Sequence, residues 1–545
     1  ASQKGGFVDY LDHEAVAKYI ALNFDPYYAH LKEFFGTVIK RTMYDEPAMH
    51  LMDGRMWTPN FNKEFEKKYG YSPMTNYPAL WYDIGPETAA ARNALFGFHA
   101  KLFAENYIGQ LAQWCEAHGI KLGGHMDQEE ARNPVAINGD LMKVFEHQQV
   151  PGIDDIYYPG RSLVSYKIVT SAAYNYDRPE CFAETYAAYR AMNPTIALRT
   201  AMDQFAMGIN IQLGTRPPEI GPEMDRFVGR MSYLLRGGRH VADVAVLYPI
   251  AALQAAYAFA KPPTSSRRGS SPDLYYALEG GIVPPEIDYM DLGEMLYRAL
   301  RVDYTYLHPE VLVSRCSVEQ QKVVLNNKEN REEFRVLILP GGDTLSADAA
   351  KKVLEFYRGG GTIIATRKLP SRSAEFKRDK EVQEMATEVF GISNDNPMTA
   401  EITIVVDDFK SYFMNRNSAG GRGCFLPQPD INILNAILKE ADPVRDVDIQ
   451  EAPMWPVKMG PAYDGALTYL HKVKGGRDIY FFANSLGKPV DTQVVLRGDK
   501  NLAIWNPHTG EKEKAEVAKS ETGGQPVTTV HLVLPPVRST FVVQE

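Results

Sequence analysis

Cysteine is scarce in this chain, and the few cysteines lie in no useful spacing. The 545 residues include only four, Cys115, Cys181, Cys316 and Cys424, and no two of them form a Cys-x-x-Cys pair. Widely scattered cysteines argue against a disulfide framework. The 12 histidines likewise show no ligand spacing, so catalytic zinc is not expected. Cysteine usage leaves the cellular compartment undecided.

Long apolar runs and an excess of positive charge are also missing. No apolar stretch reaches the roughly 18 residues of a membrane span, so we expect no membrane partner. The net charge is −9, which argues against a nucleic-acid partner because such binding needs a concentrated basic face. With 45% hydrophobic and 23% charged residues, the composition is typical of a globular protein. The length predicts two to four domains.

Two strand-like segments end in carboxylates, and they are the most informative feature present. Residues 35–44 lead into Asp45, Glu46 and a proline, and residues 178–183 lead into Glu184. In a barrel of parallel strands, the carboxyl ends of the strands converge on one mouth. Hydrolysis of a glycosidic bond requires one acid to protonate the leaving oxygen and one carboxylate to activate water or attack the sugar. The pattern therefore predicts Glu46 as general acid and Glu184 as base or nucleophile.

Helical and strand patterns alternate through the first part of the chain. This alternation predicts a (β/α) TIM-type barrel over residues 1–240. Only about five barrel strands are recognisable, whereas a closed barrel has eight. We therefore expect either an open sheet or a chain that lacks the first strands of its barrel. Downstream we expect a flavodoxin- or amidotransferase-like αβ domain over 241–395, a connecting segment over 396–465, and a β-sandwich over 466–545.

Further polar and aromatic side chains near the predicted mouth are candidates for substrate binding. Glu129 and Glu130 follow a glycine pair and a histidine; they suit a calcium ion, or they cap the helix that follows. Strand alternation turns one of the adjacent Asp154 and Asp155 toward the mouth without deciding which. For the aromatic candidates, core packing is the competing interpretation. The predicted binding set is Asp45, Trp57, His125, Glu129, Asp155, Tyr158 and Asn210.

Several segments together resemble glycoside hydrolase family 106, the α-L-rhamnosidases and their uncharacterised relatives. The segments that carry this resemblance are residues 9–16, 45–47, 57–59, 68–71, 124–130, 139–140, 151–154, 183–184, 479–484 and the Trp-Asn-Pro-His-Thr-Gly sequence at 505–510. The resemblance implies a barrel catalytic domain with accessory β domains, an inverting mechanism, and calcium in the active site. It also implies a secreted or periplasmic enzyme that releases α-L-rhamnose from a polysaccharide.

Relatives of this kind begin their barrel upstream of the segment that resembles residues 9–16. The resemblance therefore implies that this chain begins about three strands into its barrel. Two alternatives stay open. One is a retaining β-galactosidase-like hydrolase, which has a similar middle domain, and the other is a non-catalytic carbohydrate-binding or assembly protein derived from a hydrolase. The oligomeric state is also open.

Overall fold

The structure of the chain is a computed structural model, and ten stretches of it are described here. These are residues 8–47, 49, 56–156, 163–187, 193–214, 221–259, 283–392, 401–405, 410–451 and 465–545. The predicted binding residue Tyr158 lies outside them. Within the described ranges, no helix combines the length and the apolar character needed to span a bilayer.

Five parallel strands form the first sheet, and their spatial order is their order in the chain. They are β1 (Arg41–Asp45), β2 (Lys121–His125), β3 (Val150–Asp155), β4 (Phe182–Thr185) and β5 (Ile211–Leu213). Each strand pairs in parallel with the next, so all five carboxyl ends meet at one edge. The number of strands agrees with the sequence prediction. The sheet is thus about half of a barrel wall, and β1 is shorter than the predicted strand at 35–44.

Helices connect these strands, as the alternation predicted. They are α1 (His13–Leu31), α2 (Phe61–Tyr69), α3 (Thr88–Leu102), α4 (Gln110–Ala117), α5 (Leu141–Val144), α6 (Leu163–Asn175), α7 (Pro194–Ala206) and α8 (Gly221–Leu235). A π-helical turn at Phe103–Gly109 joins α3 to α4 as one long element. Side-chain caps set two of the helix starts: Asp12 accepts from the Ala15 amide, and Asn193 accepts from the Ile196 amide.

A seven-stranded sheet forms the middle of the molecule, with the order β16-β17-β18-β14-β12-β7-β8. Its strands are β7 (Val244–Leu247), β8 (Tyr304–Leu307), β12 (Val336–Leu339), β14 (Thr362–Thr366), β18 (Arg422–Leu426), β17 (Lys410–Arg416) and β16 (Glu401–Val405). Strands β7, β8, β12, β14 and β18 run parallel, and β17 and β16 add an antiparallel edge. The parallel strand β12 is buried along its whole length, as expected for a strand covered on both faces.

The prediction that 396–465 is only a connecting segment is wrong. This stretch supplies β16, β17 and β18 to the middle sheet, followed by the helix α15 (Ile431–Ala441). It also supplies β19 (Val447–Ile449) to a C-terminal sheet. The remaining helices and strands of the middle unit are α9 (Ile250–Ala256), α11 (Tyr289–Glu294), α12 (Pro309–Arg315), α13 (Ala347–Arg358), α14 (Asp379–Phe390), β9 (Cys316–Glu319), β10 (Lys322–Leu325), β11 (Glu332–Phe334), β13 (Thr344–Leu345) and β15 (Arg372–Ser373).

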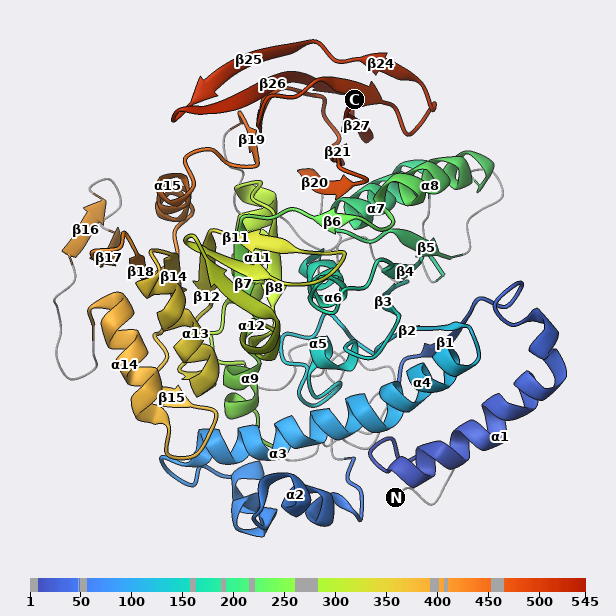
Figure 1. Cartoon of the computed structure of the whole chain (residues 1–545), viewed down its shortest axis with the longest axis vertical. Helices are drawn as coiled ribbons and strands as arrows, with labels where there is room; N and C mark the ends of the chain where they lie inside the picture. Colours follow the sequence, from blue (N-terminus) through green and yellow to red (C-terminus); the bar gives the residue numbers. More distant parts are fainter. Residues whose placement is uncertain are drawn as a thin grey trace.

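Two antiparallel sheets close the chain and lie at the top of Figure 1. One has the order β19-β22-β26-β25, and the other β24-β23-β27-β21-β20-β6. Buried side chains from both, such as Val494 and Phe482, share one hydrophobic cluster, so the two sheets pack face to face. The new strands are β6 (Arg239–His240), β20 (Leu467–Lys474), β21 (Arg477–Asn484), β22 (Val490–Arg497), β23 (Leu502–Trp505), β24 (Lys512–Lys514), β25 (Val517–Thr522), β26 (Gln525–Leu534) and β27 (Arg538–Gln544).

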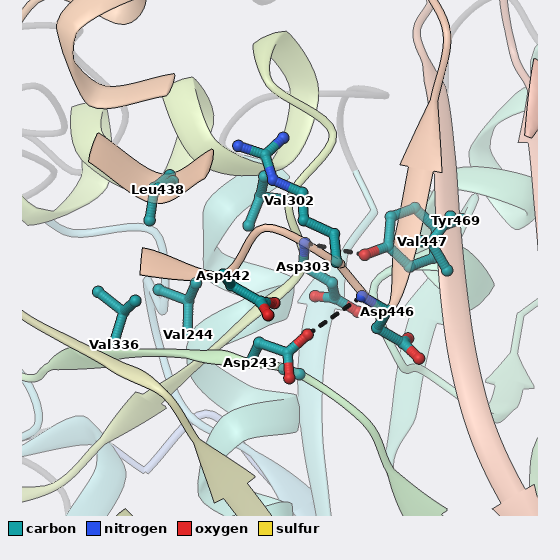
Figure 2. A pocket seen from close by; sticks show the side chains of 12 residues that line it. Asp243, Val244, Val302, Asp303, Val336, Leu438, Asp442, Asp446, Val447 and Tyr469 are labelled. Carbon is teal, nitrogen blue, oxygen red and sulfur yellow. Dashed lines mark hydrogen bonds between the residues drawn. The ribbon is translucent and has the colours of Figure 1, made fainter. Parts of the chain in front are cut away.

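Charged side chains join the middle unit to the C-terminal sheets around a small cavity of about 20 Å³ (Figure 2). Asp243 accepts a hydrogen bond from the Asp446 amide at 3.2 Å, and the Tyr469 hydroxyl accepts one from the Asp303 amide at 3.3 Å. Beside them Arg497 contacts both Asp243, at 2.6 Å, and Asp442, at 2.8 Å. Burial, together with the charge of Asp243, raises the pKa of Asp442 to about 7. This junction therefore holds a proton between two carboxyl groups.

Candidate active site

Polar side chains gather at the carboxyl edge of the five-stranded sheet. Asp45 ends β1 and is paired in register with His125, which ends β2. One step further, Asp154 of β3 is paired with Glu184 of β4. Glu46 follows β1 directly. Because the strands are parallel, residues far apart in the sequence arrive at the same edge.

His125 connects two of the carboxylates. Its ring is buried, and its Nε2 lies 3.0 Å from Glu184 Oε2 and 3.5 Å from Asp45 Oδ1. A carboxylate only accepts hydrogen bonds, so Nε2 carries the hydrogen that it donates to Glu184. The Asp45 side chain is 79% exposed and lies on the solvent side of this contact. The buried His125 ring therefore fixes the orientation of the Glu184 side chain.

Asp154 and Glu46 form a hydrogen-bonded carboxyl pair. Burial, together with the neighbouring charges of Glu46 and Glu184, raises the pKa of Asp154 to about 8. Two carboxylates in contact cannot both ionise easily, so the pair retains one proton at neutral pH. A retained proton is what a general acid needs.

Glu129 contributes a second neutral carboxyl group nearby. Its side chain is 1% exposed, and burial, followed by the charges of Glu130 and Asp154, raises its pKa well above the usual range. Its Oε1 has no hydrogen-bond partner among the described residues. A buried carboxyl held in its neutral form is a poor ligand for a cation but remains a hydrogen-bond donor.

Asp155, the predicted substrate-binding aspartate, points away from this cluster. Tyr166 of α6 donates its hydroxyl to Asp155, and Gln204 Nε2 of α7 lies 3.4 Å from it. Successive side chains on a strand face opposite sides, so Asp154 and Asp155 cannot both face the mouth. The contacts of Asp155 therefore do not support a substrate-binding role, and Asp154 is the aspartate that lies beside Glu46.

A layer of polar and aromatic groups supports the cluster from below. Gln204 donates to Thr185 at 3.1 Å, next to Glu184, and Gln212 donates to Gln204 at 2.9 Å. Under Asp154, Gly152 leaves room for the ring of Phe182, because a Cβ there would lie 2.1 Å from it. Close packing of this kind limits how far the strand ends can shift.

The backbone is strained at the same edge. Three residues that follow strands adopt positive φ angles: Glu46 at 45°, Gln128 at 53° and Tyr186 at 77°. Residues other than glycine rarely adopt positive φ angles, and such backbone strain concentrates at functional sites. The strain at Glu46 supports the view that its side chain is held in place for a task.

Two other predicted binding residues lie elsewhere in packed surroundings. Asn210 precedes β5 at the opposite end of the strand, where it accepts from the Cys181 amide and donates to the Pro179 carbonyl. Trp57 packs on Phe61 with 4.0 Å between ring centroids. The position of neither residue supports a sugar-binding role, and core packing, the competing interpretation for Trp57, describes it better.

Asp45, Glu46 and His125 are the described residues that approach a metal-ligand grouping. One ligand atom from each lies within 4.8 Å of the others. Calcium takes six to eight hard oxygens and does not favour imidazole nitrogen. The imidazole of His125 is thus a poor member of a calcium site, and the calcium implied by the resemblance stays a prediction.

A half-barrel of parallel strands with carboxyl groups at its carboxyl edge is the arrangement expected of a glycoside hydrolase. A family model described as alpha-L-rhamnosidase matches residues 1–214 and 297–519. Because that match covers most of the 545 residues, the chain belongs to glycoside hydrolase family 106.

Solved structures share this fold. A rhamnosidase from Novosphingobium sp. PP1Y superposes with a TM-score of 0.69 at 18% identity, over 99% of this chain and 48% of that one. Gan42B, a GH42 beta-galactosidase from G. stearothermophilus, superposes with a TM-score of 0.60 at 12% identity, over 98% of this chain and 82% of its own. At such identities the likeness concerns the fold alone.

A curated protein from Formosa agariphila, named "Putative beta-glucuronidase", is 22% identical over 575 residues. The alignment covers 99% of this chain and 41% of that protein. The chain thus spans less than half the length of the curated relative and of the Novosphingobium rhamnosidase.

Proposed function

We propose that this protein hydrolyses a terminal deoxy sugar, α-L-rhamnose, from a polysaccharide. Family membership supports the reaction class. The observation that carries the proposal is the cluster itself, in which the Asp154–Glu46 pair retains a proton beside Glu184. A proton donor and a carboxylate at one mouth are the two groups that glycoside hydrolysis requires.

Glu46 is the proposed general acid. It stands at the exposed edge of the sheet, whereas its partner Asp154 is partly buried behind it. Asp154 keeps a proton within the pair at neutral pH, and Glu46 passes it to the glycosidic oxygen as the bond breaks. The role of Asp154 is thus to position and hold the proton.

Glu184 is the proposed base. The hydrogen bond from His125 Nε2 holds one of its oxygens, which leaves the other to accept a proton from water. Attack by water on the face opposite the leaving group inverts the anomeric centre. We propose inversion, with release of β-L-rhamnose, on the strength of family membership. Release of the α anomer would instead indicate the retaining, β-galactosidase-like alternative.

Leaving-group dependence tests the acid role. A Glu46→Gln variant should lose about 10²–10⁴-fold in kcat/KM on rhamnosides with alkyl leaving groups and far less on dinitrophenyl rhamnoside, which needs no protonation. An equal loss on both substrates would remove Glu46 from the acid role. Glu180→Gln is the control, because Glu180 precedes β4, the strand that carries Glu184, and pairs with Lys121 at the amino end of the sheet, away from the carboxylate cluster.

Proton NMR of the first product tests the role of Glu184. The sugar released by the wild-type protein should appear first as the β anomer, before mutarotation.

A secreted or periplasmic location is part of the same proposal, since polysaccharides are met outside the cytoplasm. Absence of any rhamnose release from a panel of pectic oligosaccharides would favour the non-catalytic binding protein.

A further inference from the structure

A cationic groove of about 430 Å³ lies between α8 and the C-terminal six-stranded sheet. In Figure 1, α8 lies next to the six-stranded C-terminal sheet. We propose that the groove binds an anionic oligosaccharide, one that carries uronic-acid carboxylates. None of the residues of the carboxylate cluster lines it, so the proposal stands independently of the proposed reaction.

One face of α8 is built for the groove. Met224, Phe227 and Met231 are buried on the opposite face and pack on a hydrophobic cluster. The residues that line the groove lie three, four and seven positions apart, and so share a face: Arg226, Gly229, Arg230 and Tyr233. Placing Arg226 and Arg230 four positions apart brings like charges together, which disfavours the isolated helix. An anionic ligand removes that cost.

The cations of the groove are not matched by acids. Among its described lining residues, Arg226, Arg230 and Lys512 are positive, and none is acidic. Arg230 donates to the carbonyls of Pro507 and His508 at 3.0 and 2.9 Å, so its charge meets only neutral partners there. A guanidinium pairs well with a planar carboxylate, which favours a uronate over other anions.

Aromatic rings provide surfaces for the apolar faces of sugars. Tyr233 is 77% exposed, so its ring is accessible from solvent. Across the groove Trp505 is half-buried, with Lys512 Nζ 3.6 Å from its ring centroid. Trp505 begins the Trp-Asn-Pro-His-Thr-Gly sequence, whose backbone Arg230 anchors to α8. This sequence therefore acquires a role in shaping the groove wall.

A second hollow of about 390 Å³ continues the surface past Trp505 and Lys512. Arg477 and Lys514 add positive charge there, against the carboxylates of Glu513 and Glu545. The two hollows share Trp505 and Lys512, so together they suit an extended chain better than a single sugar.

Titration calorimetry with hexagalacturonate as the probe tests the proposal. We expect binding of hexagalacturonate that weakens as the salt concentration rises. Arg226→Gln and Tyr233→Ala should each bind it at least about tenfold more weakly. Tyr27→Ala, which changes an exposed tyrosine on α1, should bind it as the wild type does. A sulfated galactan oligosaccharide and a neutral galactan oligosaccharide of equal length are the comparison arms. Equal or tighter binding of either one would overturn the proposal for uronates, as would binding of an oligonucleotide in place of hexagalacturonate.

Gly229 offers a way to fill the groove without disturbing the fold. A Cβ on this helical glycine would meet nothing within 4 Å. Gly229→Phe should abolish hexagalacturonate binding, whereas Gly229→Ala should retain it. Both should hydrolyse aryl rhamnoside at the wild-type rate, and Glu184→Gln should bind hexagalacturonate normally, which separates this site from the proposed active site. Undiminished binding by Gly229→Phe would overturn the proposal.

Discussion

Asp154 and Glu46 share a hydrogen bond at the carboxyl edge of the sheet, although 107 positions separate them in the sequence. Parallel pairing of β1, β2 and β3 brings them together. Burial of Asp154 makes it favourable for the pair to keep a proton. The same relationship gives the molecule both a reserve proton for catalysis and a dependence on pH.

Asp154→Asn should shift the alkaline limb of the kcat/KM–pH profile to lower pH. The wild-type pair loses its proton near pH 8, the value to which burial raises the pKa of Asp154. Asparagine removes the second carboxyl, and with it the repulsion that retains the proton. A shift of about one pH unit or more is expected. An alkaline limb at the wild-type position would show that Asp154 does not hold the acid's proton.

His125→Ala should lower kcat about 10–100-fold with little change in KM, because Glu184 loses the donor that orients it. Addition of imidazole to the variant should restore part of the rate. His118→Ala, a change on the loop after α4, is the control. A proportional rise in KM instead would place His125 in ground-state binding of the sugar.

Asp442→Asn should alter how stability depends on pH. Burial and Asp243 raise the pKa of Asp442 to about 7 in the folded protein, against its ordinary 3.8 when unfolded. The folded state therefore binds the extra proton, and this contribution is complete below about pH 4 and is lost as pH rises through 7. Between pH 5 and pH 8 the wild-type Tm should fall by a few degrees relative to the variant. Parallel Tm curves for the two proteins would refute this.

Lys167→Met should destabilise the protein strongly. Lys167 of α6 pairs with Asp303 at 2.6 Å, and His240 Nε2 lies 2.8 Å from the same carboxylate, all with side chains 0–1% exposed. Removing the lysine leaves a buried charge without its partner, which costs about 3–5 kcal/mol. Denaturant unfolding measures the loss. The exposed Lys380→Met should change stability by less than about 0.5 kcal/mol, and a similar small effect at Lys167 would contradict the account.

Gly152→Ala should slow catalysis through packing alone. The new methyl group would lie 2.1 Å from the Phe182 ring, so the ring or the strands β3 and β4 must shift just below Asp154 and Glu184. Overpacking of this kind costs about 1–3 kcal/mol. A lowered Tm with a matching loss of kcat is expected, and Phe182→Leu in the same protein should restore part of both. Additive losses in the double variant would exclude this contact as the cause.

Local sequence signals predicted the strand-end carboxylates but not their detailed orientation. Glu46 and Glu184 were recognisable because each follows a strand-like segment. The choice between Asp154 and Asp155 depends on which face of β3 packs against α6 and α7, which is a tertiary relationship. Asn210 was misplaced because β5 begins after it, at Ile211, and not at the apolar residues before it.

Long-range pairing also explains the errors in domain organisation. The strand β18 pairs with β14, which lies 60 residues earlier in the chain: Ile364 of β14 is opposite Cys424 of β18. A pairing partner so distant leaves no local signal within 396–465. Similarly β6 has only two residues, and it becomes a strand through its pairing with β20. By contrast, the strands after residue 466 are recognisable in the sequence because apolar and polar residues alternate along them. The structure contains them as antiparallel sheets.

Hydrolysis of a rhamnoside with an alkyl leaving group by the wild-type protein and by Glu46→Gln and Glu184→Gln tests the central claim most directly. The account predicts measurable turnover by the wild type and a loss of at least about 10²-fold in each variant, with melting temperatures unchanged. Turnover at the wild-type rate by either folded variant would contradict it, because the two carboxyl groups could not then act together on the glycosidic bond.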